Sequence, residues 1–249
     1  MDNTGQLVEI LRRLNAGEDV EKVKQEATAL LENIDATELS LAEQQLIDEG
    51  MAPEDLRGLC VIHMEMLADE LEGLKACLEQ DHPLRVMIDE HDAILGFLGE
   101  LEALNKEMQK LVVLDPNSAE IARLRQVAEN LVGAEKHHQR EEEALFPAME
   151  RLGITGPPRI MRLEHDDLRP HKEELLDLVE EAKSLPLEKF KAELARLSKY
   201  IVFALRDHIF KENYILYPTA FESIAHKEAW AKIKEQCDDI GYCTFTPGV

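Results

Sequence analysis

The segment HHQREEEALFP, residues 137–147, contains the pattern from which the fold can be predicted. A second stretch repeats its pattern, from His208 through Glu212 to Pro218. In both, a His-x-x-x-Glu unit stands ten and six residues before the proline of a Leu-Phe-Pro or Leu-Tyr-Pro sequence. Residues four apart share one face of an α-helix, so each unit projects an imidazole and a carboxylate together. The repeat predicts two matching helices that face a common interior.

A Glu-His-Asp triplet precedes each unit and adds one more histidine to each copy. His91 and His165 occupy helix positions where a leucine would normally complete the apolar seam. Imidazole and carboxylate together are the ligand set of Fe, Mn or Zn, and the absence of cysteine from the pattern argues against a structural zinc site. The sequence therefore predicts a buried metal site, of two metals, with six ligands: His91, His137, Glu141, His165, His208 and Glu212.

Each piece of this pattern also has a simpler interpretation. A lone helical histidine is most often a core or surface residue, and a single His-x-x-x-Glu is often just an exposed pair. The repetition of residue type, order and offset favours the metal site. The register in the first copy stays open, because His138 and Glu142 have the same spacing as His137 and Glu141. Matching Pro147 to Pro218 selects His137 and Glu141.

The overall charge excludes several classes of function. The chain has 28 Lys and Arg against 51 Asp and Glu, a net charge of −23, which would repel nucleic acid and anionic lipid. No signal peptide and no apolar run of about 18 residues is found, so we expect no membrane span. Four scattered cysteines form no CxxC pair and suit a reducing compartment. We expect a cytoplasmic protein with neither a nucleic-acid nor a membrane partner.

The composition, and the positions of the glycines and prolines that end helices, predict an all-α chain of three parts. Residues 1–75 read as a small helical domain, residues 76–225 as an up-down-up-down four-helix bundle, and residues 226–249 as an amphipathic C-terminal segment and tail. The predicted bundle helices are Pro83–Leu111, Asn117–Arg151, Arg159–Ser184 and Leu187–Leu216, with a loop at Gly153–Pro158, a kink at Pro170 and an amphipathic segment at Ser223–Gln236.

Residues 80–222 resemble a hemerythrin-like (HHE cation-binding) domain, through Glu90-His91, His137-x-x-x-Glu141, Glu164-His165 and His208-x-x-x-Glu212. The resemblance implies a four-helix bundle around a non-haem di-iron centre, which can be oxo-bridged and in which Mn or Zn can substitute. It places His91 and His137 on one side of the centre and His165 and His208 on the other. Glu141 and Glu212 would then bridge the irons.

One departure from the family bears on function. Oxygen-carrying hemerythrins have a fifth histidine one turn after the third-helix ligand, and Arg169 stands there in this chain. Four histidines and two glutamates are more similar to the domains of iron-centre repair proteins and of iron or redox sensors. The resemblance thus implies reaction with O2, NO or peroxide in redox or nitrosative stress or in iron-centre repair. The alternative is a sensor of oxygen or iron without turnover. No catalytic residue is assigned, and whether the protein is an enzyme is left open.

The first 75 residues resemble an N-terminal helical domain of unknown function that often precedes such bundles. The resemblance rests on Glu49-Gly50-Met51-Ala52-Pro53 and Leu59-Cys60-Val61-Ile62-His63. In the sensor interpretation, we expect a protein partner to bind through residues 1–75.

Overall fold

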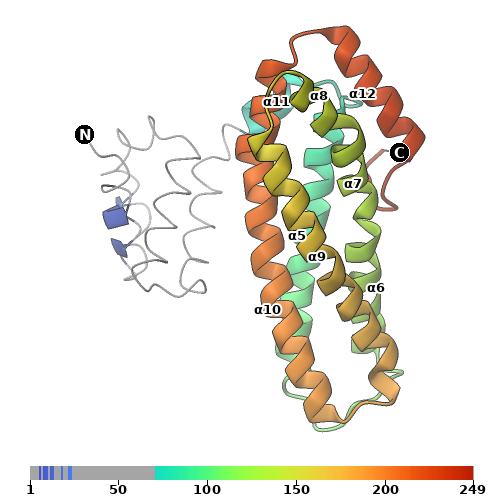
Figure 1. Ribbon diagram of the computed structural model, residues 1–249. Helices are drawn as coiled ribbons and strands as arrows, with labels where there is room; N and C mark the ends of the chain where they lie inside the picture. Colours follow the sequence, from blue (N-terminus) through green and yellow to red (C-terminus); the bar gives the residue numbers. More distant parts are fainter. Residues whose placement is uncertain are drawn as a thin grey trace. The chain divides into compact units, whose positions relative to one another are not determined.

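The computed structural model describes residues 71–248, together with residues 6, 8–10, 12, 13, 18, 22 and 23. Every regular element in this part of the chain is a helix, and the long helices pack side by side as a bundle (Figure 1). The predicted all-α fold with a four-helix bundle is confirmed. The small helical domain predicted for residues 1–75 lies almost entirely outside the described residues.

The bundle consists of four long helical segments joined by short connections. They are α5 (Pro83–Met108); α6 (Ala119–Gly133) with α7 (Glu135–Arg140), η1 (Glu141–Leu145) and α8 (Phe146–Arg151); α9 (Gly156–Glu180) with η2 (Glu181–Lys183); and α10 (Leu187–Lys211) with η3 (Glu212–Leu216) and α11 (Tyr217–Ser223). A further helix, α12 (Lys227–Ile240), follows the bundle. It begins later and ends later than the predicted Ser223–Gln236.

Side chains at the helix starts explain where the segments begin. The Nδ1 atom of His82 accepts a hydrogen bond from the Leu84 N–H at the start of α5, and the Ser118 hydroxyl accepts one from the Ile121 N–H at the start of α6. The predicted loop at Gly153–Pro158 is wrong at its end, because α9 already begins at Gly156. Pro157 and Pro158 fit the first turn of α9, because the N–H groups of a first helical turn have no partner within the helix.

The second and fourth segments each contain a π-helical turn that the sequence prediction treated as ordinary α-helix. These turns are η1 and η3, and each begins at the glutamate of a His-x-x-x-Glu unit. In η1, the Phe146 N–H donates to the Glu141 carbonyl five residues back. Pro147 has no N–H, and its ring would collide with the carbonyl four residues back, so the helix widens there. Pro218 stands in the same place after η3.

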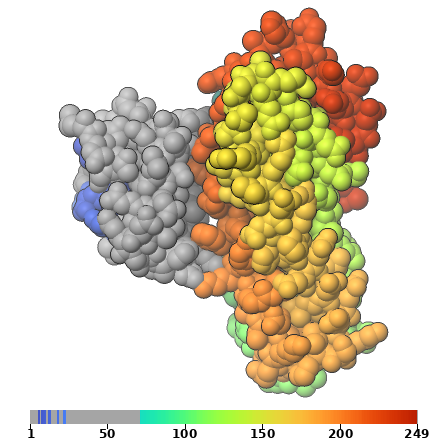
Figure 2. Space-filling view, in the orientation of Figure 1, coloured from blue at the N-terminus to red at the C-terminus, as the bar shows by residue number. Residues whose placement is uncertain are grey.

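The bundle core is aliphatic over most of its length. Leucines such as Leu101 of α5, Leu124 of α6, Leu175 of α9 and Leu194 of α10 are fully buried in one cluster. The segment α6 packs against both α5 and α9, and α12 packs against α5, α7 and η1. In Figure 2, atoms of α9 and α10 form much of the visible surface of the bundle. None of the described helices is long and apolar enough to cross a bilayer.

The chain divides into two compact units. One takes in Met1–Ala76 and Phe210–Ile215, and the other takes in Cys77–Ile209 and Leu216–Val249. The domain boundaries predicted from the sequence, at about residues 75 and 225, stay predictions.

The helix α9, for which the sequence predicted a kink at Pro170, runs through that residue as one element.

Replacing Leu124 by alanine tests the packing of this core. Because the side chain is completely buried, Leu124→Ala should lower the free energy of unfolding by about 2–5 kcal/mol. Denaturant titration followed by circular dichroism measures the change. The control is Val113→Ala, at a side chain that is 70% exposed, where the change should stay below about 0.5 kcal/mol. Equal effects of the two substitutions would contradict the packing described.

Candidate metal centre

The six residues predicted as ligands are all buried in the bundle and fall into two overlapping groups. The first group is His91, His137 and Glu212, and the second is Glu141, His165, His208 and Glu212. Within each group the candidate ligand atoms lie within 4.8 Å of one another. Glu212 belongs to both groups. This is the division into two sides that the family resemblance implies, and metal binding by these residues stays a prediction.

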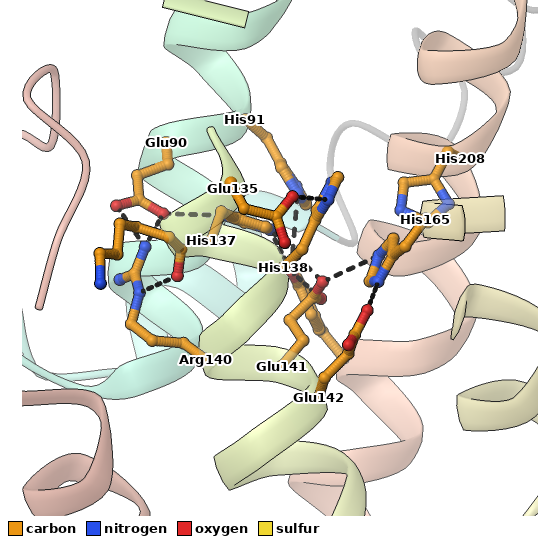
Figure 3. Close-up of polar contacts among 12 residues, drawn as sticks. Glu90, His91, Glu135, His137, His138, Arg140, Glu141, Glu142, His165 and His208 are labelled. Atoms are coloured by element: carbon orange, nitrogen blue, oxygen red, sulfur yellow. Dashed lines mark hydrogen bonds and ion pairs between the residues drawn. The ribbon is translucent and has the colours of Figure 1, made fainter. Parts of the chain in front are cut away.

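Glu141 lies between the histidines of the two groups (Figure 3). Its Oε2 atom is 3.8 Å from the Nε2 of His137 and 3.4 Å from the Nε2 of His165. That oxygen is fully buried and accepts no hydrogen bond from any described residue. A buried carboxylate oxygen that accepts no hydrogen bond is costly, and a cation on either side of it would remove that cost.

The first group also has a geometry that suits one shared cation. The Nε2 atoms of His91 and His137 are 3.1 Å apart, and the rings are tilted by 41°. Two nitrogens bound to one ion at about 2.0–2.1 Å are separated by roughly 3.0–3.4 Å. The two imidazoles therefore already hold the spacing of two ligands of one ion.

Three of the four predicted histidine ligands are oriented by a carboxylate at Nδ1. His137 contacts Glu90 at 2.7 Å, His165 contacts Glu142 at 2.7 Å, and His208 contacts Glu164 at 2.8 Å. A carboxylate at Nδ1 accepts a hydrogen bond from the ring N–H and so leaves the Nε2 lone pair directed towards the site, as in many metal–histidine centres. Glu90 and Glu164, which stand directly before His91 and His165 in the sequence, each make such a contact with the histidine of the next segment.

Glu90 is the most strongly held of these carboxylates. It accepts hydrogen bonds from Arg140 and from the Thr246 hydroxyl, as well as contacting His137. Burial alone would raise the pKa of Glu90, but His137, Arg140 and Thr246 outweigh it and lower that pKa to about 2. Glu90 is therefore a carboxylate at neutral pH, which fixes His137 as the donor at Nδ1.

Arg169 anchors the carboxylates on the other side of the site. Its guanidinium donates to Glu135 at 2.9 Å and to Glu142 at 2.7 Å. These bonds raise the pKa of Arg169, against the opposite effect of burial. Arg169 thus holds the carboxylates of Glu135 and Glu142 in place.

The structure buries both histidines of the register that the sequence left open, His137 and His138. Metal binding by either of them stays a prediction. His138 stacks on His165 with ring centroids 3.9 Å apart, and forms a further candidate ligand group with His165 and His208. Glu141 faces the interior, whereas Glu142 contacts Nδ1 of His165 from outside. The two histidines are therefore not alternatives.

Tyr217, which is not among the six ligands predicted from the sequence, also lies at the site. Its hydroxyl donates to Oε1 of Glu141 at 2.8 Å and lies 3.2 Å from Nε2 of His137. The ring stacks on His91 at 5.5 Å. One signal could have found it: Leu-Phe-Pro in the first copy becomes Leu-Tyr-Pro in the second, which puts a hydroxyl at the end of a ligand helix.

A buried lysine lies outside these contacts. The Nζ atom of Lys172 on α9 is buried and has no hydrogen-bond partner among the described residues. Burial lowers the pKa of Lys172 to about 8. Burial and the charge of Lys172 in turn lower the pKa of His138 well below its usual range, which keeps this imidazole neutral.

The donor set fits a pair of cations. Imidazole nitrogens and carboxylate oxygens converge from four helical segments, and they are the ligands of Fe, Mn and Zn in proteins. No described cysteine belongs to the groups. The helical bundle and its buried His/Glu cluster, which is suitable for metal, together define the class of the protein: a helical-bundle cation-binding protein.

Comparison with known families gives the same class. Residues 82–220 match the Hemerythrin HHE cation binding domain, and the chain belongs to that family. Residues 7–73 match a family of unknown function (DUF438). No curated protein gives a significant match. The resemblance recognised in the sequence is thereby confirmed for both parts of the chain.

The pH dependence of stability tests the buried state of Lys172. Its pKa is lower in the folded chain, about 8, than the usual 10.5, so the unfolded chain binds more protons between these values. Stability should therefore rise as pH increases from about 8 to 10.5. Lys172→Met should remove that rise and add about 2 kcal/mol to the free energy of unfolding at pH 7.

Denaturant unfolding of both proteins across this pH range, at equal metal loading, measures the difference. Lys191→Met is the matched control, because Lys191 pairs loosely with the exposed carboxylate of Glu188. An unchanged or lower stability of Lys172→Met at pH 7 would contradict the burial of an unpaired ammonium.

Proposed function

We propose that this protein binds two non-haem iron ions in the bundle and reacts with O2, NO or peroxide, in redox or nitrosative stress or in iron-centre repair. The observation that carries the proposal is the position of the Glu141 carboxylate, between His137 of one ligand group and His165 of the other. A buried carboxylate that faces imidazoles on two sides is the arrangement that two adjacent cations require. Glu212, which belongs to both groups, supports the same interpretation.

Iron is favoured over a structural zinc site by the donor types. The described cysteines near the site are Cys237 and Cys243, and burial raises the pKa of these thiols to about 11 and about 12. Neither of these two thiols belongs to a candidate ligand group. Imidazole and carboxylate remain as donors, and manganese or zinc could replace iron on them.

Bound ferrous iron would supply the electrons that reduce a small oxidant. The residues of this chain have distinct roles around it. The carboxylates of Glu90, Glu142 and Glu164 hold the imidazoles in place. The Tyr217 hydroxyl holds a proton at Oε1 of Glu141, beside the first ligand group. The closed bundle limits access of water to the interior.

A sensor without turnover is the second candidate, and one contact favours it. Glu90 joins His137 to Thr246 in the C-terminal tail, so a change at the first ligand group could reach the surface. The expected protein partner of such a sensor would bind through residues 1–75, which lie mostly outside the described residues. Repeated consumption of excess peroxide by the iron-loaded protein would favour the first candidate. A single stoichiometric reaction would favour the sensor.

Iron binding tests the proposed function directly. After anaerobic loading with ferrous iron and desalting, the chain should retain about two iron ions and show charge-transfer absorption in the near ultraviolet when oxidised. His165→Ala should lose most of this iron and unfold at a lower temperature, because bound metal stabilises the folded state.

The control variant is His171→Ala, on the same helix. Its Nδ1 contacts the Asp167 carbonyl rather than a ligand group, so its iron content should match that of the parent protein. Less than about half an equivalent of iron in the parent, or full iron in His165→Ala, would overturn the proposal.

Tyr217→Phe tests whether the Tyr217 hydroxyl, which is hydrogen-bonded to Glu141, supplies a proton to the reaction. The variant should keep its iron, because the ring still packs on His91, but its ferrous form should react with hydrogen peroxide on the order of 10²-fold more slowly. Stopped-flow absorption measures the rate. Tyr242→Phe is the control, since that hydroxyl bonds to the exposed Asp238. Equal rates in Tyr217→Phe and the parent protein would show that Tyr217 is not the proton donor.

A further inference from the structure

We propose that His138 is a seventh metal-ligating residue, which gives one ion three imidazoles, those of His138, His165 and His208. The inference rests on the proposed function, because it concerns the same site. It differs from the ligand set predicted from the sequence, in which His138 was only an alternative to His137.

The position of His138 is the first argument. Its side chain is 3% exposed, and it offers a ligand nitrogen within 4.8 Å of those of His165 and His208. Its ring centroid is 3.9 Å from that of His165 and 5.8 Å from that of His208. A single cation could accept a lone pair from each of these three buried imidazoles.

The unpartnered ring nitrogen of His138 is a second observation. Its Nδ1 atom is buried and has no hydrogen-bond partner among the described residues. Oε2 of Glu135 lies 3.5 Å away, farther than the 2.7 Å at which Glu90 contacts His137 and Glu142 contacts His165. A buried imidazole nitrogen without a partner costs free energy, and a cation bound there would remove that cost.

Helix geometry explains how adjacent residues can serve different ions. Successive residues of an α-helix point about 100° apart. His137 and His138 accordingly have ring planes at 79° and centroids 6.1 Å apart. His137 turns towards His91, and His138 turns towards His165. A single turn of α7 thus supplies one imidazole to each ligand group.

The resulting centre is asymmetric, with three imidazoles on one side and two on the other. The third imidazole comes from α7, whereas position 169 on α9, where oxygen carriers have a histidine, is occupied by Arg169. The side with fewer protein ligands, that of His91 and His137, would keep the open position for an external ligand. Tyr217 lies on this side, with its hydroxyl 3.2 Å from Nε2 of His137.

Cobalt(II) is the probe for counting the imidazoles. It takes the same nitrogen and oxygen donors as ferrous iron and shifts the proton resonances of its ligands strongly. The cobalt-loaded protein should show five exchangeable, strongly shifted imidazole N–H resonances, one for each ligating histidine. Four resonances in the parent protein would overturn the proposal without any variant.

His138→Phe separates coordination from stacking, because phenylalanine keeps a flat ring against His165 but has no donor atom. We expect it to lose one shifted N–H resonance and to bind cobalt on the order of 10²-fold more weakly at one of the two sites. His171→Phe is the matched control, since His171 also stacks on an aromatic ring, that of Tyr200, at 3.9 Å. It should keep all five resonances and the parent affinity.

The possible failures are distinct. If the parent binds two metal ions and His138→Phe keeps the same affinity and resonances, His138 only stacks and the inference is wrong, while the proposed function stands. If the parent binds neither cobalt nor iron, the proposed function fails and the inference fails with it.

Discussion

The structure depends on the burial of carboxylates among imidazoles at one level of a helical bundle. Glu141 and Glu212 are 0% and 1% exposed, and Oε2 of Glu141 faces two imidazole nitrogens at 3.4 and 3.8 Å. Such groups cost free energy in an apolar interior unless positive charge lies between them. The aliphatic core along the rest of the bundle holds the four segments at the spacing at which this cluster can exist.

The first two segments of the bundle and the last two, here called its halves, form this arrangement through the same local contacts. In each half, the glutamate before the first histidine contacts Nδ1 of the histidine in the next segment, Glu90 with His137 and Glu164 with His208. In each half, a proline forces a π-helical turn that begins at the inward-facing glutamate. π-turns inside α-helices occur frequently at functional sites, and here they coincide with the residues of the candidate centre.

The sequence predicted the bundle and the burial of the six residues because both depend on spacing within helices, which a repeated pattern reveals. It did not predict what depends on the packing of different segments. The start of α9 at Gly156 was missed because prolines were read only as loop signals. The inward position of His138 was missed because His137 and His138 were treated as competing registers, although adjacent residues can face two different neighbours. Tyr217 was missed because a hydroxyl that meets Glu141 across 76 residues leaves no local pattern.

The most direct test of this account is anomalous diffraction at the iron absorption edge, from crystals of the chain loaded anaerobically with ferrous iron. Two anomalous peaks are expected inside the bundle, one on each side of the Glu141 carboxylate. The first should lie beside His91 and His137, and the second beside His165 and His208. Peaks only at the acidic surface, or no peak near Glu141 in protein that carries iron, would contradict it.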